Sequence, residues 1–180
     1  MEKINIITRC TRFDNLMEIS NSISHDVGDV GIDIIWYVIF DTKFSKSIDI
    51  KIPESISKVS ILKFISSEPG SYAYDSINKC LDEIKEGWVY ILDDDNILHD
   101  KFKERISALI RLYPKKNGII FSQDVSGRDF SGLDIRRADI DNIKVGKIDV
   151  SQFILRRDLI GDFRFVCGYT GDGIFIEEIY

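Results

Sequence analysis

The sequence contains little cysteine and no cysteine motif. Its 180 residues include three cysteines, Cys10, Cys80 and Cys167, which lie far apart and form no CxxC pair. Neither a zinc knuckle nor a disulfide framework is therefore expected, and we interpret the cysteines as free thiols in a reducing compartment. No tract rich in proline, glycine or serine marks a linker, and no internal repeat is present. We therefore expect residues 1–180 to form a single domain.

A long apolar run is also missing. The most apolar stretch, residues 34–40, is flanked by Asp33 and Asp41. It is too short to span a bilayer, which requires about 20 residues in a helix. The N-terminus does not show the charged-then-apolar pattern of a signal peptide. These absences predict a cytoplasmic protein, which could still bind the inner face of a membrane through a partner.

Positive charge is not in excess. Lys and Arg number 24 against 30 Asp and Glu, so the formal net charge is −6. General nucleic-acid binding needs a positive surface to displace counterions from phosphate, and no nucleic-acid partner is therefore expected. The hydrophobic fraction of 44% is ordinary for a soluble domain that buries a core.

Strand-like and helix-like patterns alternate along the chain. Short runs of β-branched, aliphatic or aromatic residues predict strands at 4–7, 32–40, 59–64, 88–92, 118–122 and 147–155. Apolar residues at every third or fourth position predict helices at 15–24, 71–84 and 100–113, and another helix can begin at 174. Residues 123–145 are expected to form a long loop or irregular hairpin. The alternation favours an α/β domain with a mainly parallel sheet.

Three consecutive acids, Asp93, Asp94 and Asp95, directly follow the predicted strand 88–92. Adjacent like charges repel, and a bound divalent cation is a good reason to retain them. Alternate residues of an extended segment point to the same side, so Asp93 and Asp95 are expected to face one site and Asp94 another. Oxygen ligands favour Mg²⁺ or Mn²⁺, with phosphates completing the shell. The alternative is a solvated acidic turn before the next helix.

Residues 88–96 resemble the DxD motif of GT-A glycosyltransferases, notably those of family 2. They are also similar to the inverting β-glucuronyltransferases, in which an aromatic strand runs into three aspartates and an asparagine. The resemblance covers most of the chain as an ordered series of short motifs. It implies a three-layer αβα GT-A domain that transfers a sugar from a nucleotide-sugar donor, by default a UDP-sugar. The acceptor would be a hydroxyl group of a glycan or a lipid-linked sugar.

The resemblance also implies a set of donor-binding residues. They are Thr8, Arg9 and Arg12 in the opening nucleotide loop, Asp41 after the second strand, Asn78 on the helix before the DxD strand, Asp93 and Asp94 in the DxD segment, and Gln152 near the sugar pocket. Ile77 stands where family 2 members carry an arginine next to the asparagine. Asp95 is the expected direct ligand of Mn²⁺ or Mg²⁺, and Asp93 would share the metal or reach the ribose. Arg9 and Arg12 could instead be plain surface charges.

Asp172 is the expected general base. Residues 168–173 resemble the loop that supplies the catalytic acid residue in family 2, and inverting transfer needs a group that takes the proton of the acceptor hydroxyl. Gly171 and Gly173 allow the backbone beside Asp172 to come close to a ligand. Asp172 could alternatively cap the last helix. Glu177 and Glu178 are nearby substitutes for the base.

Two other functions stay open at this stage. A nucleotidyltransferase also combines a nucleotide, a metal and an α/β sheet, but residues 7–12 contain no glycine for its usual phosphate loop. A non-catalytic domain of the same fold would bind a nucleotide-sugar or act as a scaffold. Asp93, Asp95 and Asp172 argue against such a loss of activity. A second domain or a peripheral membrane partner could complete the acceptor side.

Overall fold

The computed structural model describes residues 2–24, 31–41, 63–67, 74–126, 135–168 and 170–179. Within these residues the main sheet has six strands in the order β3-β2-β1-β4-β8-β5. The strands are β1 (Glu2–Cys10), β2 (Ile32–Asp41), β3 (Lys63–Ser67), β4 (Trp88–Ile91), β5 (Gly118–Ile120) and β8 (Phe153–Arg156). β1 to β4 run parallel, whereas β8 is antiparallel to both of its neighbours. The mainly parallel sheet expected from the sequence is confirmed.

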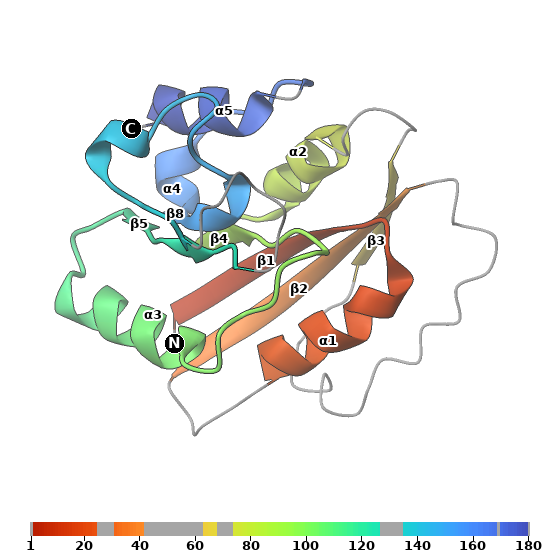
Figure 1. Cartoon of the computed structure of the whole chain (residues 1–180), viewed down its shortest axis with the longest axis horizontal. Helices are drawn as coiled ribbons and strands as arrows, with labels where there is room; N and C mark the ends of the chain where they lie inside the picture. Colours follow the sequence, from red (N-terminus) through yellow and green to blue (C-terminus); the bar gives the residue numbers. More distant parts are fainter. Residues whose placement is uncertain are drawn as a thin grey trace.

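Helices cover both faces of this sheet (Figure 1). On one face lie α1 (Phe13–Ser24) and α3 (Phe102–Leu112), and on the other lie α2 (Tyr74–Glu83), α4 (Arg157–Ile160) and α5 (Gly171–Ile179). The three-layer architecture is therefore confirmed. None of the helices placed by the structure has the length and apolar character needed to cross a membrane.

The central strand β1 is buried on both faces, as its continuous apolar run predicts. Alternate residues of a strand point to opposite faces, so Ile4 and Ile6 join the core beneath α1 and α3. Ile7 faces the other way and joins the core beneath α2 and α5, where it meets Ile77. All four side chains are 0% exposed. Burying each one stabilises the fold by about 1.5–3 kcal/mol relative to solvent.

Several boundaries differ from those predicted. β1 was expected to end at residue 7, but it pairs with β2 as far as Cys10. The pairing continues because β2 is long enough to supply partners along the whole strand. The third strand begins at Lys63, and the predicted residues 59–62 lie outside the described part, as do residues 71–73 before α2. The last helix begins earlier than expected, at Gly171.

The segment 147–155 was predicted as one strand, and this is wrong for its first half. Val150–Gln152 form a 3-10 turn (η4), and the strand begins only at Phe153. The cause is a capping box: the Asp149 side chain accepts from the backbone N–H of Ser151, and the Gln152 side chain accepts from that of Asp149.

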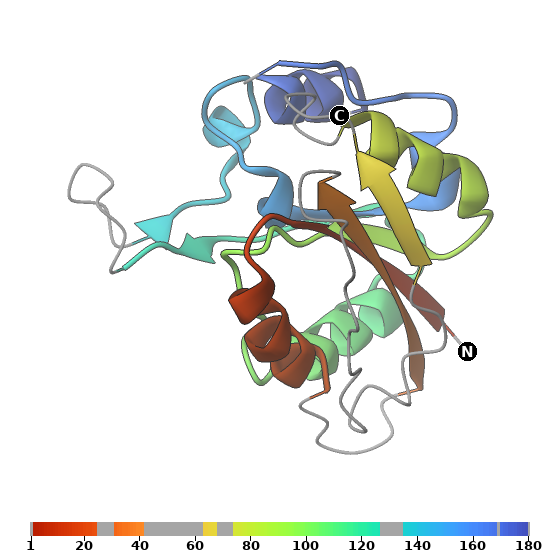
Figure 2. The same ribbon diagram turned by 90° about the vertical axis from the view of Figure 1, so that its right-hand side faces the viewer.

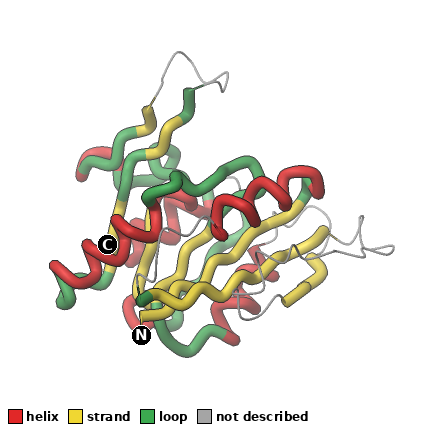
Figure 3. Tube along the Cα trace, turned by 90° about the horizontal axis from the view of Figure 1, so that it is seen from below, coloured by secondary structure: helices red, strands yellow, loops and turns green. Residues whose placement is uncertain are grey.

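The polar segment after β5 forms a hairpin where it is described. β6 (Gln123–Asp124) pairs with β7 (Ile135–Arg136) in an antiparallel ribbon, followed by the 3-10 turn η3 (Ile140–Asn142). Figures 2 and 3 show this hairpin projecting away from the layers of the domain. The irregular hairpin expected for 123–145 is thus present in its described residues, and residues 127–134 lie outside them.

Candidate functional site

The candidate site lies at the carboxyl edge of the parallel strands. β1 and β4 are neighbours, and the backbone N–H of Leu92 continues their pairing by donating to the carbonyl of Ile7 at 2.9 Å. The chain leaving β1 and the three acids that follow β4 therefore meet. Open α/β sheets place their ligands at this edge.

Asp94 joins these two segments. Its Oδ2 accepts hydrogen bonds from the backbone N–H groups of Thr11 and Arg12, at 2.5 and 2.7 Å, and from the Thr11 hydroxyl at 2.8 Å. The Asn15 amide also donates to the Asp94 carbonyl at 2.7 Å. Asp94 is 5% exposed. Its carboxylate fixes the loop between β1 and α1, which is a positioning task rather than a direct contact with a ligand.

Asp93 pairs with Arg9. The guanidinium donates from Nε and Nη2 to the two carboxylate oxygens, at 2.8 and 2.6 Å. Such fork geometry is the strongest form of this ion pair. Burial raises the pKa of Asp93 to about 6, although the charge and hydrogen bonds of Arg9 act in the opposite direction. The pair stands at the floor of the site, since only about a fifth of each side chain is exposed.

Asp95 is the most exposed of the three acids. The exposed fractions of the side chains are 6% for Asp94, 20% for Asp93 and 33% for Asp95. Arg12, itself half-exposed, places Nη2 3.6 Å from an oxygen of Asp95. Asn96 donates to the other oxygen at 3.3 Å. Asp95 thus presents a carboxylate toward solvent, beside a cation that an anionic ligand would also contact.

Asp172 is connected to the acids that follow β4 through Tyr74 and Arg9. It occupies the first turn of α5, where Tyr74, the first residue of α2, donates its hydroxyl to Oδ1 at 2.7 Å. The guanidinium carbon of Arg9 lies 5.6 Å from the centre of the Tyr74 ring, within range of a cation–π interaction. Asp93, Arg9, Tyr74 and Asp172 therefore form one continuous chain of contacts.

The electrostatics of Asp172 suit a base. Burial raises the pKa of its carboxyl group above the ordinary value, while the hydrogen bond from Tyr74 and the charge of Arg9 act in the opposite direction. Gly171 makes the approach of Tyr74 possible. A Cβ at Gly171 would lie 2.5 Å from the carbonyl oxygen of Val166 and 3.0 Å from the Tyr74 ring.

Replacing Tyr74 with Phe is expected to move the acid limb of kcat/KM to higher pH. The base expected at Asp172 would act when ionised, so activity would fall as the pH drops through the pKa of Asp172. The Tyr74 hydroxyl stabilises the ionised carboxylate, and its removal raises that pKa. The pH profile of nucleotide release measures the shift, and carboxyl-carbon NMR of Asp172 provides a reading that does not need turnover.

Tyr90→Phe is the matched control for Tyr74→Phe. Tyr90 is also a buried tyrosine, but its hydroxyl donates to the backbone carbonyl of Ser151 at 3.1 Å. We expect its acid limb to coincide with that of the wild type. If Tyr74→Phe shifts neither the acid limb of the pH profile nor the pKa read from the Asp172 carboxyl signal, Tyr74 does not act on Asp172.

Three of the expected donor-binding residues form side-chain hydrogen bonds within the protein. Thr8 is 0% exposed, and its hydroxyl accepts from the indole N–H of Trp36 at 2.9 Å. Asn78 makes a reciprocal pair of 2.9 Å hydrogen bonds with the backbone of Phe165. Gln152, 1% exposed, accepts from Asp149 and donates to backbone carbonyls. The structure does not bring these side chains to the solvent side of the site. β2 ends at Asp41, whose side chain lies outside the described part.

Ser151 belongs to the site and was missed in the sequence. Its hydroxyl oxygen accepts from the backbone N–H of Asp93 at 3.4 Å and from the Asn96 amide at 3.2 Å. Because β8 runs antiparallel to β4, the turn that precedes β8 lies beside the acids that follow β4. The Asp-x-x-Gln spacing of Asp149 and Gln152 was a usable signal for that turn.

The acids after β4 fit a divalent cation only with help from a ligand. Among the residues whose placement is described, no group of three or more His, Cys, Asp and Glu side chains could hold a metal ion. Mg²⁺ is usually bound by one or two protein carboxylates together with substrate phosphates, and Mn²⁺ accepts the same oxygen ligands. Asp95 fits that pattern. Asp93 fits it less well in this conformation, because Arg9 bonds both of its oxygens.

The fold matches solved glycosyltransferases of the GT-A type. Two are TarS 1-349 of S. aureus in complex with UDP (TM-score 0.73, 17% identity, 100% of this chain and 55% of that chain) and with UDP-GlcNAc (0.68, 18%, 100% and 53%). A third is the mannosyltransferase PcManGT from Pyrobaculum calidifontis with GDP-Man and Mn²⁺ (0.61, 15%, 99% and 52%). No family model and no curated protein matches the sequence. The chain spans about half the length of these structures, and at this identity the likeness establishes a GT-A fold.

Proposed function

We propose that this chain is a metal-dependent, inverting glycosyltransferase that moves a sugar, in the simplest case a hexose, from a UDP-sugar to an acceptor hydroxyl. The observation that carries the proposal is that a solvent-facing Asp95 follows Asp93 by two residues, while Asp172 is connected to Asp93 through Tyr74 and Arg9. The Asp95 carboxylate faces solvent beside Arg12, where a diphosphate would bind. The Asp172 carboxylate is partly buried and has a raised pKa, as a base needs.

The solved structures support a nucleotide-sugar as the ligand. TarS was solved with UDP and with UDP-GlcNAc, and PcManGT with GDP-Man and Mn²⁺. A UDP-sugar is the donor that we test first, and GDP is the competing nucleotide. The acceptor proposed here is a glycan or a lipid-linked sugar.

The chain's own residues would divide the chemistry between two ends of the site. Asp95 would hold Mn²⁺ or Mg²⁺ together with the donor diphosphate, and Arg12 would contribute positive charge nearby. The metal supplies a Lewis acid that stabilises the departing nucleotide diphosphate. Asp93 would share the metal or reach the ribose when Arg9 releases one of its oxygens.

Asp172 would take the proton from the acceptor hydroxyl as that oxygen attacks the sugar. Tyr74 donates to Oδ1 of this carboxylate, and a backbone hydrogen bond from Val150 also helps to hold it in place. Asp41 remains the proposed partner of the nucleotide base. For Thr8, Asn78, Asp94 and Gln152 we now propose indirect roles, because their hydrogen bonds hold the strands, turns and loops that carry the site.

Titration calorimetry of UDP and GDP, each with and without Mn²⁺, tests the donor site. We expect one nucleotide to bind in a metal-dependent manner, and Asp95→Ala to weaken that binding at least about tenfold, or about 1.4 kcal/mol. Asp100→Ala is the matched control, because Asp100 is a highly exposed aspartate just beyond the same loop. Its nucleotide affinity should equal that of the wild type.

Other results would contradict the proposal. If neither nucleotide binds, or if binding ignores both Mn²⁺ and Asp95, the chain is better described as a scaffold domain of the same fold. Equal losses in Asp95→Ala and Asp100→Ala would indicate a general charge effect rather than a metal ligand.

A further inference from the structure

One segment of this acidic chain contains no acidic residue. Residues 105–123 include four of the 24 Lys and Arg residues and none of the 30 Asp and Glu residues. The segment covers most of α3, the turn after it and the edge strand β5. The four basic residues are Arg105, Arg111, Lys115 and Lys116. Arg105 lies near the start of α3, but the other three lie at or just beyond its C-terminal end, although the net charge of the chain is −6.

Large apolar side chains are exposed in the same place. Residues 111–118 are all exposed, and within them Leu112 is 70% and Tyr113 56% exposed. Leu109, one turn earlier on α3, is 36% exposed. These side chains and the neighbouring basic residues form a surface that we call the α3–β5 patch. It consists of Leu109, Arg111, Leu112, Tyr113, Lys115 and Lys116. Arg111 also suits the negative end of the helix dipole, but Lys115 and Lys116 lie beyond the helix and are not explained by it.

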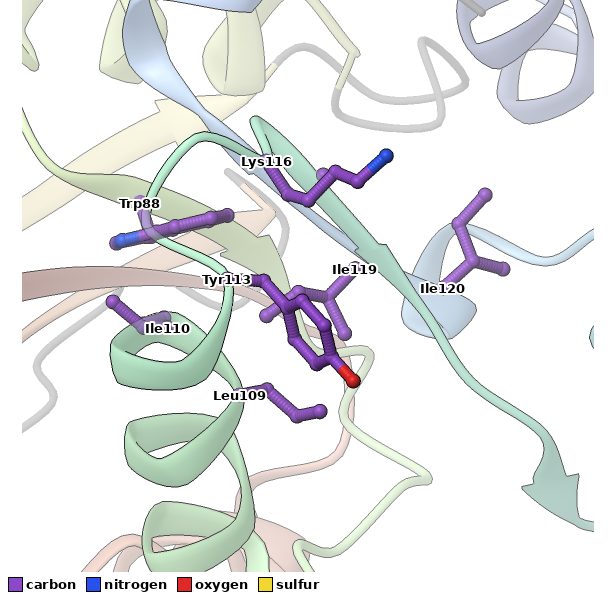
Figure 4. A pocket seen from close by; sticks show the side chains of 8 residues that line it. Trp88, Leu109, Ile110, Tyr113, Lys116, Ile119 and Ile120 are labelled. Atoms are coloured by element: carbon purple, nitrogen blue, oxygen red, sulfur yellow. The ribbon is translucent and has the colours of Figure 1, made fainter.

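A shallow hollow lies within this patch. Its volume is about 240 Å³, and it is lined by Leu109, Ile110, Tyr113, Ile119 and Ile120 above the ring of Trp88. Figure 4 shows the Tyr113 ring between Leu109 and Ile119, while the Lys116 side chain extends away from the apolar lining. An apolar floor with an aromatic and cationic rim is the arrangement that amphipathic segments present to the boundary between lipid headgroups and acyl chains.

We propose that the α3–β5 patch docks the protein on an anionic lipid bilayer. Leu109, Leu112 and Tyr113 would enter the headgroup boundary, and Lys115 and Lys116 would contact lipid phosphates. Binding of phosphate groups alone would account for the exposed lysines. It would not account for the exposed leucines, which are stabilised only when they enter an apolar phase. A second copy of this chain fits poorly, because a two-fold interface would place the same positive charges opposite each other.

The patch is separate from the candidate site. Trp88, beneath the patch, begins β4, whereas Asp93 follows the end of that strand. Docking would therefore leave the carboxyl edge of the sheet accessible. The proposal does not depend on the glycosyltransferase assignment, and each can fail without the other.

Vesicle co-sedimentation of the full chain tests the docking. We expect binding to vesicles of equimolar phosphatidylcholine and phosphatidylglycerol and at least tenfold weaker binding to phosphatidylcholine alone, with a decline at high salt. Lys115→Glu/Lys116→Glu should lower binding to the anionic vesicles at least tenfold, and Leu112→Ser/Tyr113→Ser should do the same. Lys144→Glu/Lys147→Glu is the control. Both lysines are exposed outside the patch, and the substitutions change the net charge as much as Lys115→Glu/Lys116→Glu does.

Three outcomes would overturn the docking proposal. One is equal binding to neutral and anionic vesicles, and another is an equal loss in the patch variants and in the control. The third is a dimer in light scattering that Leu112→Ser/Tyr113→Ser dissolves, because the patch would then be an interface between copies. Circular dichroism of each variant separates lost docking from lost folding, and UDP calorimetry on the same samples keeps this result apart from the donor site.

Discussion

Asp172→Asn is expected to lower kcat by a factor between about 10² and 10⁴, the usual contribution of a general base. Asn has nearly the same shape and can still accept the Tyr74 hydroxyl, but it cannot take a proton. UDP affinity should be unchanged, because Asp172 lies on α5 and contacts Tyr74, whereas the proposed metal ligand belongs to the segment after β4. Steady-state kinetics of UDP release, together with calorimetry, separates the two effects.

Glu178→Gln provides the comparison for Asp172→Asn. Glu178 lies on the same helix but is exposed, so its removal should leave kcat within about twofold of the wild type. Glu177 already accepts from the backbone N–H of Val145 at 2.6 Å, which makes it a helix-to-loop contact. If Glu178→Gln loses as much activity as Asp172→Asn, or if Asp172→Asn retains most of its activity, the base has been assigned to the wrong residue.

Arg9→Met is expected to lower the free energy of unfolding at pH 7 by about 3 kcal/mol, the lower end of the range for breaking a buried ion pair. The loss arises because Asp93 would have to carry its charge, or take up a proton to lose it, in a largely buried position without its fork partner. Part of this loss in the free energy of unfolding should disappear at lower pH. The pKa of Asp93 is already raised to about 6, and loss of Arg9 raises it further, so the acid becomes neutral as the pH falls.

Urea unfolding at pH 7 and pH 5 measures this effect, with Arg12→Met as the matched control. Arg12 is 55% exposed, and its contacts with Asp94 and Asp95 are 3.8 and 3.6 Å long. Its replacement should cost at most about 1 kcal/mol at either pH. Similar losses for the two arginines, or a loss in Arg9→Met that does not depend on pH, would show that the Arg9–Asp93 pair does not stabilise the fold.

The sequence predicted the fold class and the order of strands and helices better than the individual side-chain contacts. Alternating periodicity indicated the α/β class, and the strand parity of residues 93–95 indicated that Asp94 points away from Asp93 and Asp95. The structure confirms the α/β class. Residues 93–96 form a turn rather than an extended segment, however, so Asp94 and Asp95 both lie near Arg12 while Asp93 bonds Arg9. Both inferences depend on local geometry, namely the repeat of side chains along one element.

Contacts between distant segments could not be predicted in the same way. Tyr74 and Asp172 are 98 positions apart, and their hydrogen bond depends on how α2 and α5 pack together. Thr8 was expected in a loop, because its own sequence does not reveal that β2 would extend the pairing past it. Asn78 has the polarity of a ligand contact, but only tertiary structure shows that its amide is bonded to the backbone of Phe165.

The reversed direction of β8 has a consequence for how domains of this fold could diversify. The wall beside Asp93 is supplied by Ser151, in the turn that enters β8, and the β6–β7 hairpin precedes that turn in the chain. Length changes in the hairpin would thus alter the surroundings of the candidate site without touching the four parallel strands. Surface connections tolerate insertions far better than buried strands do. New binding preferences could accordingly arise by exchanging this one segment, while the half of the domain built from β1 to β4 is inherited intact.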